Sequence, residues 1–212
     1  MEIIKFGQAD SSNVLIRPVD NHDLSYIEKE AELIKEAVGD DWCLTAVKVD
    51  NWNDDLSPWN APAVFGNDGF GGRAVETLQE ILKLTGDAKK TYYIGGYSLA
   101  GLFSLWAAYN TDVFAGVAAA SPSVWFPGFT GYMESNEIRC QSVYLSLGDK
   151  EEKTKNQVMS TVGDCIRYAY DLLKGRDIEC TLEWNSGNHF KDADVRTAKA
   201  FAWILAHSLN RR

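Results

Sequence analysis

Residues Gly95 to Gly101 read Gly-Gly-Tyr-Ser-Leu-Ala-Gly, and Ser98 at their centre determines how the rest of the chain is interpreted. The preceding run, Thr-Tyr-Tyr-Ile at 91–94, is typical of a buried strand, since β-branched and aromatic residues favour strands. After the serine, apolar residues recur at helical spacing: Leu99, Leu102, Phe103 and Trp106. A direct turn from strand to helix needs small residues, which Gly96 and Ala100 supply. The pattern therefore predicts a tight turn that pushes the serine hydroxyl out at the carboxyl end of a strand.

Strand-like and helix-like segments alternate on both sides of this turn. The other strands are expected at 2–6, 13–18, 42–49, 114–120, 142–147 and 179–184, and the other helices at 23–38, 74–84, 153–173 and 192–209. Such alternation indicates parallel β-α-β units whose right-handed crossovers cover both faces of a sheet. We expect one domain over residues 1–212: a three-layer α/β/α sandwich with a mostly parallel sheet and, since no long insertion follows 114–120, no large lid.

Composition narrows the possible partners. The net charge of −9 argues against binding to nucleic acid or to an anionic membrane surface, and no apolar stretch approaches the length of a membrane span. The four cysteines form no Cys-x-x-Cys pair, so a metal site is not expected. No signal-like segment opens the sequence, and we expect a cytoplasmic protein.

A serine hydroxyl is a weak nucleophile at neutral pH and needs a base within hydrogen-bond reach. The chain has three histidines. His22 precedes the first long helix, and His207 lies in the last turns of the final helix, where a cation suits the helix dipole. His189 follows the last strand, on a glycine-containing loop. This loop lies at the carboxyl ends of the strands, where Ser98 is also expected. His189 is therefore the predicted general base for Ser98, which becomes the predicted nucleophile.

The base needs an acceptor that fixes its tautomer and stabilises the imidazolium. The loop after strand 142–147 offers three carboxylates, in Gly148-Asp-Lys-Glu-Glu-Lys153. In this architecture the acid commonly stands three residues after a strand-ending glycine, which selects Glu151. Asp149 is the alternative, since its side chain is shorter and closer to the strand end. Glu152 is expected to face solvent.

The order Ser98, acid at 149–151, His189 resembles that of the α/β-hydrolase superfamily. The segment Ala119-Ala-Ser-Pro-Ser-Val-Trp125 is similar to the Ser-Pro-Ser-x-Trp pattern of its putative esterase group, which includes esterase D and feruloyl-esterase-like enzymes. The resemblance covers about residue 41 to the C-terminus. It implies a serine nucleophile elbow, with a sheet here smaller than the usual eight strands because the N-terminal strands are curtailed.

The resemblance also implies an oxyanion hole, although no His-Gly motif precedes the expected loop. One donor should be the backbone N–H of Leu99. The other should come from the loop after residue 49, from Trp52 or Asn51. Trp125 is a candidate wall of the substrate pocket, whereas the aromatic residues of loop 50–72 are expected mainly to pack that loop onto the domain: Trp52, Trp59, Phe65 and Phe70.

These features favour a serine hydrolase that cleaves carboxylic esters of small molecules through an acyl-enzyme, without metal or organic cofactor. Two alternatives remain open. The first is a non-catalytic binding or regulatory protein on the same fold, motivated by the smaller sheet and the missing oxyanion motif. The second is a thioesterase or peptidase with the same triad, which would differ only in the leaving group. The sequence does not indicate the oligomeric state.

Overall fold

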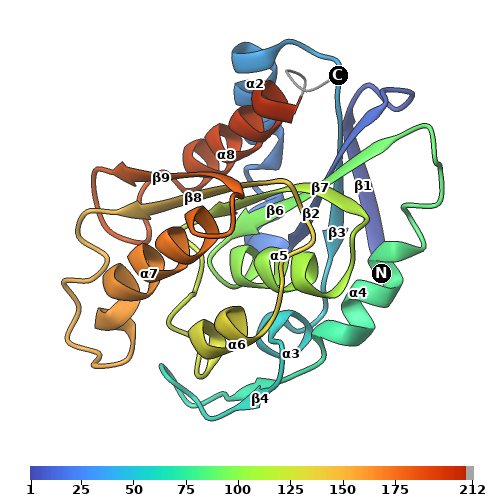
Figure 1. Ribbon diagram of the computed structural model, residues 1–212. Coiled ribbons are helices and arrows are strands. Elements are labelled where there is room, and N and C mark those ends of the chain that lie inside the picture. Colours follow the sequence, from blue (N-terminus) through green and yellow to red (C-terminus); the bar gives the residue numbers. More distant parts are fainter. Residues whose placement is uncertain (209–212) are drawn as a thin grey trace.

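The computed structural model describes residues 1–208, and its centre is a seven-stranded sheet in the order β1-β3-β2-β6-β7-β8-β9 (Figure 1). The strands are β1 (Glu2–Gly7), β2 (Asn13–Val19), β3 (Cys43–Lys48), β6 (Thr91–Tyr97), β7 (Phe114–Ala120), β8 (Ser142–Gly148) and β9 (Glu179–Asn185). Only β1 pairs antiparallel, with β3, and the remaining neighbours are parallel. The predicted mostly parallel sheet is confirmed, and with seven strands it is smaller than eight.

Helices cover both faces of this sheet, as predicted (Figure 1). They are α1 (Asn21–Leu24), α2 (Ile27–Val38), α3 (Trp52–Leu56), α4 (Ala74–Leu82), α5 (Leu99–Asn110), α6 (Phe129–Ser135), α7 (Val162–Lys174) and α8 (Ala193–Ser208). Helices α2 and α8 pack against each other on one face, and α5 and α7 lie on the other. Because both faces are covered, the strands between them are buried on both sides rather than alternating between buried and exposed residues, and β2 and β8 are buried along their whole length.

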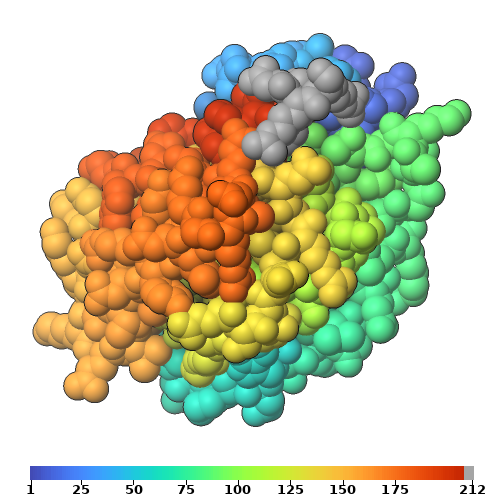
Figure 2. Space-filling view, in the orientation of Figure 1, coloured from blue at the N-terminus to red at the C-terminus, as the bar shows by residue number. Residues whose placement is uncertain are grey.

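Four segments differ from the sequence-based expectation. The helix expected over 23–38 is divided into α1 and α2, with Ser25 and Tyr26 between them. The segment 50–72, at the lower end of the molecule in Figure 2, holds α3 and a short pairing of β4 (Asn60–Ala61) with β5 (Phe70–Gly71), rather than only loop. Helix α6 was not expected. The helix expected from 153 begins only at Val162, after a 3₁₀ turn at Met159–Thr161, because residues 149–157 offer no apolar side chain to bury. Leu209, the expected end of the last helix, lies outside the described residues.

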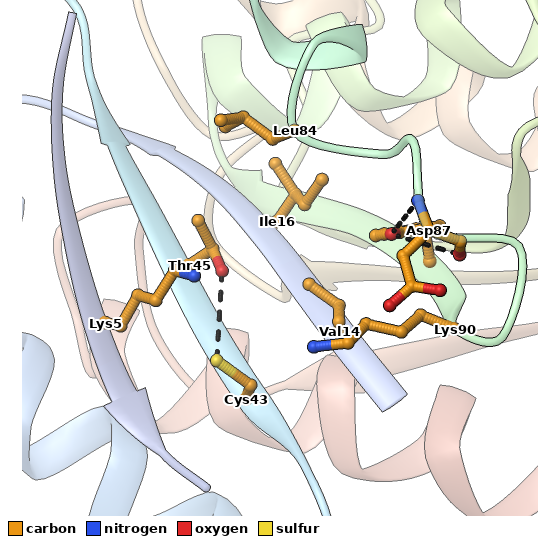
Figure 3. Close-up of a pocket in the computed structure, with 9 residues that line it drawn as sticks. Lys5, Val14, Ile16, Cys43, Thr45, Leu84, Asp87 and Lys90 are labelled. Atoms are coloured by element: carbon orange, nitrogen blue, oxygen red, sulfur yellow. Dashed lines mark hydrogen bonds between the residues drawn. The ribbon is translucent and has the colours of Figure 1, made fainter. Parts of the chain in front are cut away.

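A cavity of about 160 Å³ opens at the amino end of the sheet (Figure 3). Its floor is apolar, with Val14 and Ile16 of β2, and Lys5 and Lys90 stand at its edge. Lys90 Nζ donates a hydrogen bond to the carbonyl of Ala9 at 3.2 Å. The cavity lies at the opposite end of the strands from Ser98. Separately, among the helices that the structure describes, none is long and apolar enough to cross a membrane.

Candidate active site

Ser98 stands at the turn between β6 and α5, with a backbone φ of +57° and ψ of −119°. A non-glycine residue adopts such a conformation only when its surroundings impose it, and these conformations concentrate at functional sites. Here a β-carbon added to Gly96 would stand 2.6 Å from Cβ of Ala100, so the turn cannot close around a larger residue. The two small residues that the sequence singled out therefore meet each other beneath the serine.

His189 connects Ser98 to an acidic side chain. Its Nε2 lies 3.0 Å from Ser98 Oγ, and its Nδ1 lies 2.7 Å from Oε2 of Glu151. The three residues follow β6, β8 and β9, so the loops at the carboxyl ends of these strands bring them together on the same side of the sheet. Ser98 and His189 are partly exposed, whereas the carboxylate of Glu151 is buried. This is the hydrogen-bonded order of a serine–histidine–acid triad.

Glu151 is held as a charged acceptor. Besides His189, its carboxylate receives hydrogen bonds on Oε1 from the Gly148 backbone N–H at 2.7 Å, Ser121 Oγ at 2.8 Å and Arg196 Nη1 at 2.9 Å. Burial alone would raise the pKa of this carboxyl, but the hydrogen bond and charge of His189, with the bonds from Gly148 and Ser121, bring the pKa below its ordinary value. Glu151 is therefore ionised at neutral pH, as an acceptor for a histidine base must be.

Asp149, the alternative acid, makes a different contact. Its Oδ1 accepts the backbone N–H of Gly187 at 2.8 Å, and this hydrogen bond lowers the pKa of the Asp149 carboxyl. Two backbone bonds join the same segments, from Asp149 N–H to Asn185 O and from Lys150 N–H to Gly187 O. Asp149 thus ties the loop of the acid to the loop of His189, while Glu151 alone of the two contacts the imidazole.

The expected oxyanion donors lie at the starts of two helices. Leu99 is the first residue of α5 and Trp52 the first residue of α3, and the first N–H groups of a helix have no intrahelical acceptor. The N–H of Asn51 is occupied, since it donates to Oδ2 of Asp55 at 2.8 Å. Between the two residues considered for the second donor, this contact favours Trp52.

Most aromatic residues of loop 50–72 pack the loop onto the domain. Trp59 contacts the rings of Phe126, Phe129 and Tyr132, and its Nε1 donates to the Pro127 carbonyl. Phe70 is buried against Trp125 and Phe126. Phe65 differs, because it is 48% exposed and packs edge-on against Trp125. Trp125 is itself only 8% exposed, so little of its ring is accessible.

The Ser-Pro-Ser-x-Trp segment contributes contacts that the sequence alone did not indicate. Ser121, with a φ of +41°, donates to Glu151, and Ser123 Oγ lies 3.3 Å from Ser98 Oγ. The backbone N–H of Ser123 also donates to the carbonyl of Ser98. The motif therefore contacts both Ser98 and Glu151, the two residues that flank His189, and its value as a sequence signal has a physical basis.

Arg196 and Tyr97 were also missed. Arg196 reads in sequence as an ordinary surface residue of the last helix, yet its side chain is 1% exposed and reaches Glu151. Tyr97, directly before Ser98, donates its hydroxyl to the backbone carbonyl of His189 at 2.7 Å. Only the crossing of α8 over the sheet brings Arg196 to this point, and no local pattern announces it.

Comparisons with known proteins show similar folds at low sequence identity. No family model matches the sequence, and no curated protein matches it. Among solved structures, an IroE-like serine hydrolase from Shewanella oneidensis is similar with a TM-score of 0.76 at 12% identity, over 95% of this chain and 74% of that one. The siderophore hydrolase EstA from Aspergillus nidulans gives 0.69 at 17% identity, over 97% and 86%. Acyl-protein thioesterase 2 from Zea mays gives 0.61 at 12% identity, over 96% and 99%.

This chain has the α/β-hydrolase fold. The resemblance drawn from the sequence is confirmed at that level, and the neighbours are hydrolases and esterases by name. Within this fold the elbow of Ser98 opens α5, and the acid and histidine loops follow β8 and β9. At identities of 11–17%, the similar structures establish the fold alone, and the chemistry depends on the residues of this chain.

Proposed function

We propose that this protein is a serine hydrolase that cleaves carboxylic esters of small molecules, with Ser98 as nucleophile, His189 as general base and Glu151 as triad acid. The observation that carries the proposal is the pair of contacts around the imidazole, 3.0 Å to Ser98 Oγ and 2.7 Å to Glu151 Oε2. The strained backbone at Ser98 supports it, because residues in such conformations concentrate at functional sites.

The reaction follows from these positions. His189 Nε2 takes the proton of Ser98 Oγ as this oxygen bonds to the ester carbonyl carbon, and the carbonyl oxygen becomes an oxyanion. The N–H groups of Leu99 and Trp52 stabilise this charge. His189 then returns the proton to the departing alkoxide oxygen, which leaves as the alcohol. A water molecule, deprotonated by His189, repeats the sequence and releases the acid from Ser98. Glu151 stays ionised and stabilises the imidazolium throughout.

The substrate side of the site is open. Ser98 is partly exposed, and the only helix between β7 and β8 is the seven-residue α6, which packs near α7 rather than forming a large lid. We infer that Phe65 and Trp125 contact the acyl group, since Phe65 is the exposed end of an otherwise buried aromatic cluster and packs against Trp125. All four cysteines are free thiols, in keeping with the proposed cytoplasmic location.

The decisive experiment is labelling with a fluorophosphonate probe, comparing the natural chain with Ser98→Ala. We expect labelling of the natural chain at Ser98 and none of the variant. An absence of labelling in the folded natural chain would favour the non-catalytic alternative, and labelling that survives Ser98→Ala would place the nucleophile elsewhere. A panel of p-nitrophenyl esters and acyl thioesters then ranks the leaving groups, since a thioesterase would prefer the second set.

A further inference from the structure

Arg196 reaches the triad from the layer of helices opposite to the one that carries the nucleophile. Ser98 opens α5 on one face of the sheet, whereas Arg196 comes from the first turn of α8 on the other. Its side chain is 1% exposed, and arginine keeps its charge at all accessible pH values. A buried charge of this kind is costly unless every donor is used, so its partners indicate what it does.

Those partners come from the ends of four neighbouring strands, β6 to β9. Nη1 is within hydrogen-bond distance of Glu151 Oε1, Ser121 Oγ and Tyr97 Oη, at 2.9, 3.2 and 3.1 Å. Nη2 donates to the backbone carbonyl of Asn188 at 3.1 Å and, at 3.4 Å, to that of Ser186. One guanidinium therefore donates hydrogen bonds both to the Glu151 carboxylate and to the backbone just before His189.

The hydroxyl groups of Ser121 and Tyr97 add further hydrogen bonds to the same two segments. A guanidinium can only donate, and the two hydrogens of Nη1 are shared among three oxygens, so Ser121 Oγ and Tyr97 Oη act as acceptors toward Arg196 and are free to direct their own hydrogens onward. Ser121 donates to Glu151, and Tyr97 donates to the carbonyl of His189. Burial raises the pKa of Tyr97 to about 12, so this hydroxyl keeps its proton at any working pH.

We propose that Arg196 is a positioning residue that fixes Glu151 and the His189 loop relative to each other. Its positive charge also weakens the electrostatic stabilisation that Glu151 gives to the protonated imidazole. This inference rests on the proposed function. Oε1 of Glu151 is filled by Arg196 and its neighbours, which leaves Oε2 to face His189 Nδ1. The carboxylate thus shares its negative charge between a permanent cation and a base that becomes cationic only during turnover.

The charged groups around His189 define what a pH measurement reports. Glu151 comes from the loop after β8, Arg196 from α8 and Tyr97 from β6. Asp149 is bonded to the Gly187 N–H in the same loop as His189, and Lys191 pairs with Asp192 at the exposed end of that loop. Of these, only Glu151 and Arg196 are buried charges: Glu151 contacts the imidazole, and Arg196 contacts Glu151. Removing the charge of Arg196 should therefore change the protonation of His189 most.

The test compares Arg196→Lys, Arg196→Met and Tyr97→Phe, with Arg17→Lys as a matched control at a second buried arginine that does not contact the triad. Arg196→Lys keeps the charge and loses the fork, so we expect kcat to fall roughly 10- to 100-fold with KM nearly unchanged and the pH profile unmoved. Arg196→Met should lower kcat further and move the acid limb of kcat/KM upward by about 1 pH unit, because Glu151 then acts on the imidazole alone.

Tyr97→Phe removes a single hydroxyl and preserves the ring, so it serves if the arginine variants do not fold. We expect it to lower kcat about 10-fold with an unmoved profile. Folded Arg196 variants with wild-type kcat would overturn the proposal, as would an unmoved acid limb in Arg196→Met or, where neither folds, full activity in Tyr97→Phe. Fluorophosphonate labelling of the natural chain separates these outcomes from failure of the proposed function, since it tests Ser98 alone.

Discussion

Two buried arginines lie under the same layer of helices, and their carboxylate partners behave in opposite ways. Arg17 of β2 is fully buried and pairs with Glu30 of α2 at 3.0 Å and with Asp23 at 3.4 Å. Arg196 of α8 pairs with Glu151 at 2.9 Å. The distances are similar, yet the pKa of Glu151 lies below its ordinary value, whereas burial raises that of Glu30 to about 8.

Hydrogen-bond donors account for the difference. Glu151 receives a backbone N–H, a serine hydroxyl, a guanidinium N–H and the imidazole. Among the described residues, no hydrogen bond reaches either carboxyl oxygen of Glu30, since Oε1 lies 3.0 Å from Arg17 Nε without hydrogen-bond geometry. A nearby cation is therefore not enough to keep a buried carboxylate charged. A set of hydrogen-bond donors that reaches both of its oxygens keeps it charged. The cluster of Arg17 and Glu30 serves the packing of the fold, whereas the cluster of Arg196 and Glu151 keeps a carboxylate charged.

The largest expected effect separates the two carboxylates by activity. Glu151→Gln should lower kcat roughly 10³- to 10⁴-fold, because an amide neither fixes the tautomer of His189 nor stabilises its imidazolium. Glu30→Gln is the matched control and should leave kcat unchanged. Both follow from initial rates on a p-nitrophenyl ester. Equal losses in the two variants would end the distinction between a structural and a catalytic cluster.

The second prediction separates the arginines by stability. Arg17→Met should reduce the free energy of unfolding by about 3–5 kcal/mol, because it removes one partner of a buried polar cluster and leaves the side chains of Glu30 and Asp23 buried without it. Urea unfolding followed by tryptophan fluorescence measures this change. The kcat of the folded fraction should stay at the wild-type value. If kcat fell as expected for Arg196→Met, the Arg17 cluster would also act on the active site, and the comparison would fail.

The third prediction uses the raised pKa of Glu30. The folded state keeps the proton of Glu30 up to about pH 8, whereas the unfolded chain releases it near its ordinary value of 4.5. Between these values the folded state binds more protons, so this contribution to stability is full at low pH and is lost as the pH rises through the window. Glu30→Gln cannot ionise, and its Tm should gain on that of the natural chain between pH 5 and pH 8. A constant Tm difference over that range would contradict the assignment.

The fold could be predicted from the sequence because its signals are local. Alternating apolar runs and helical stripes give the order of strands and helices, and the small residues around Ser98 give the turn. Errors arose where the signal was absent or non-local. Residues 149–157 carry charge without an apolar face, and Asn156 instead ties this segment to the carbonyl of Val64.

The candidate site could be predicted in part for the same reason. Chain order and position after successive strands selected Ser98 and His189, and spacing from Gly148 preferred Glu151 over Asp149. The residues that support them could not be found this way. Arg196 meets Glu151 across 45 positions and Tyr97 meets His189 across 92, so only the packing of α8 and the pairing of the strands bring them together.

The smallest expected effect distinguishes the two acids of one loop. Asp149→Asn should change kcat at most a few-fold, because the amide oxygen of asparagine can still accept the Gly187 N–H that the carboxylate now binds. The same exchange of charge for amide at Glu151 removes the partner of the imidazole. Asp149→Ala, which cannot accept the bond, should raise the mobility of the His189 loop and lower kcat further than Asp149→Asn does. A loss in Asp149→Asn as deep as in Glu151→Gln would mean that the exposed carboxylate, and not the buried one, acts on His189 during turnover.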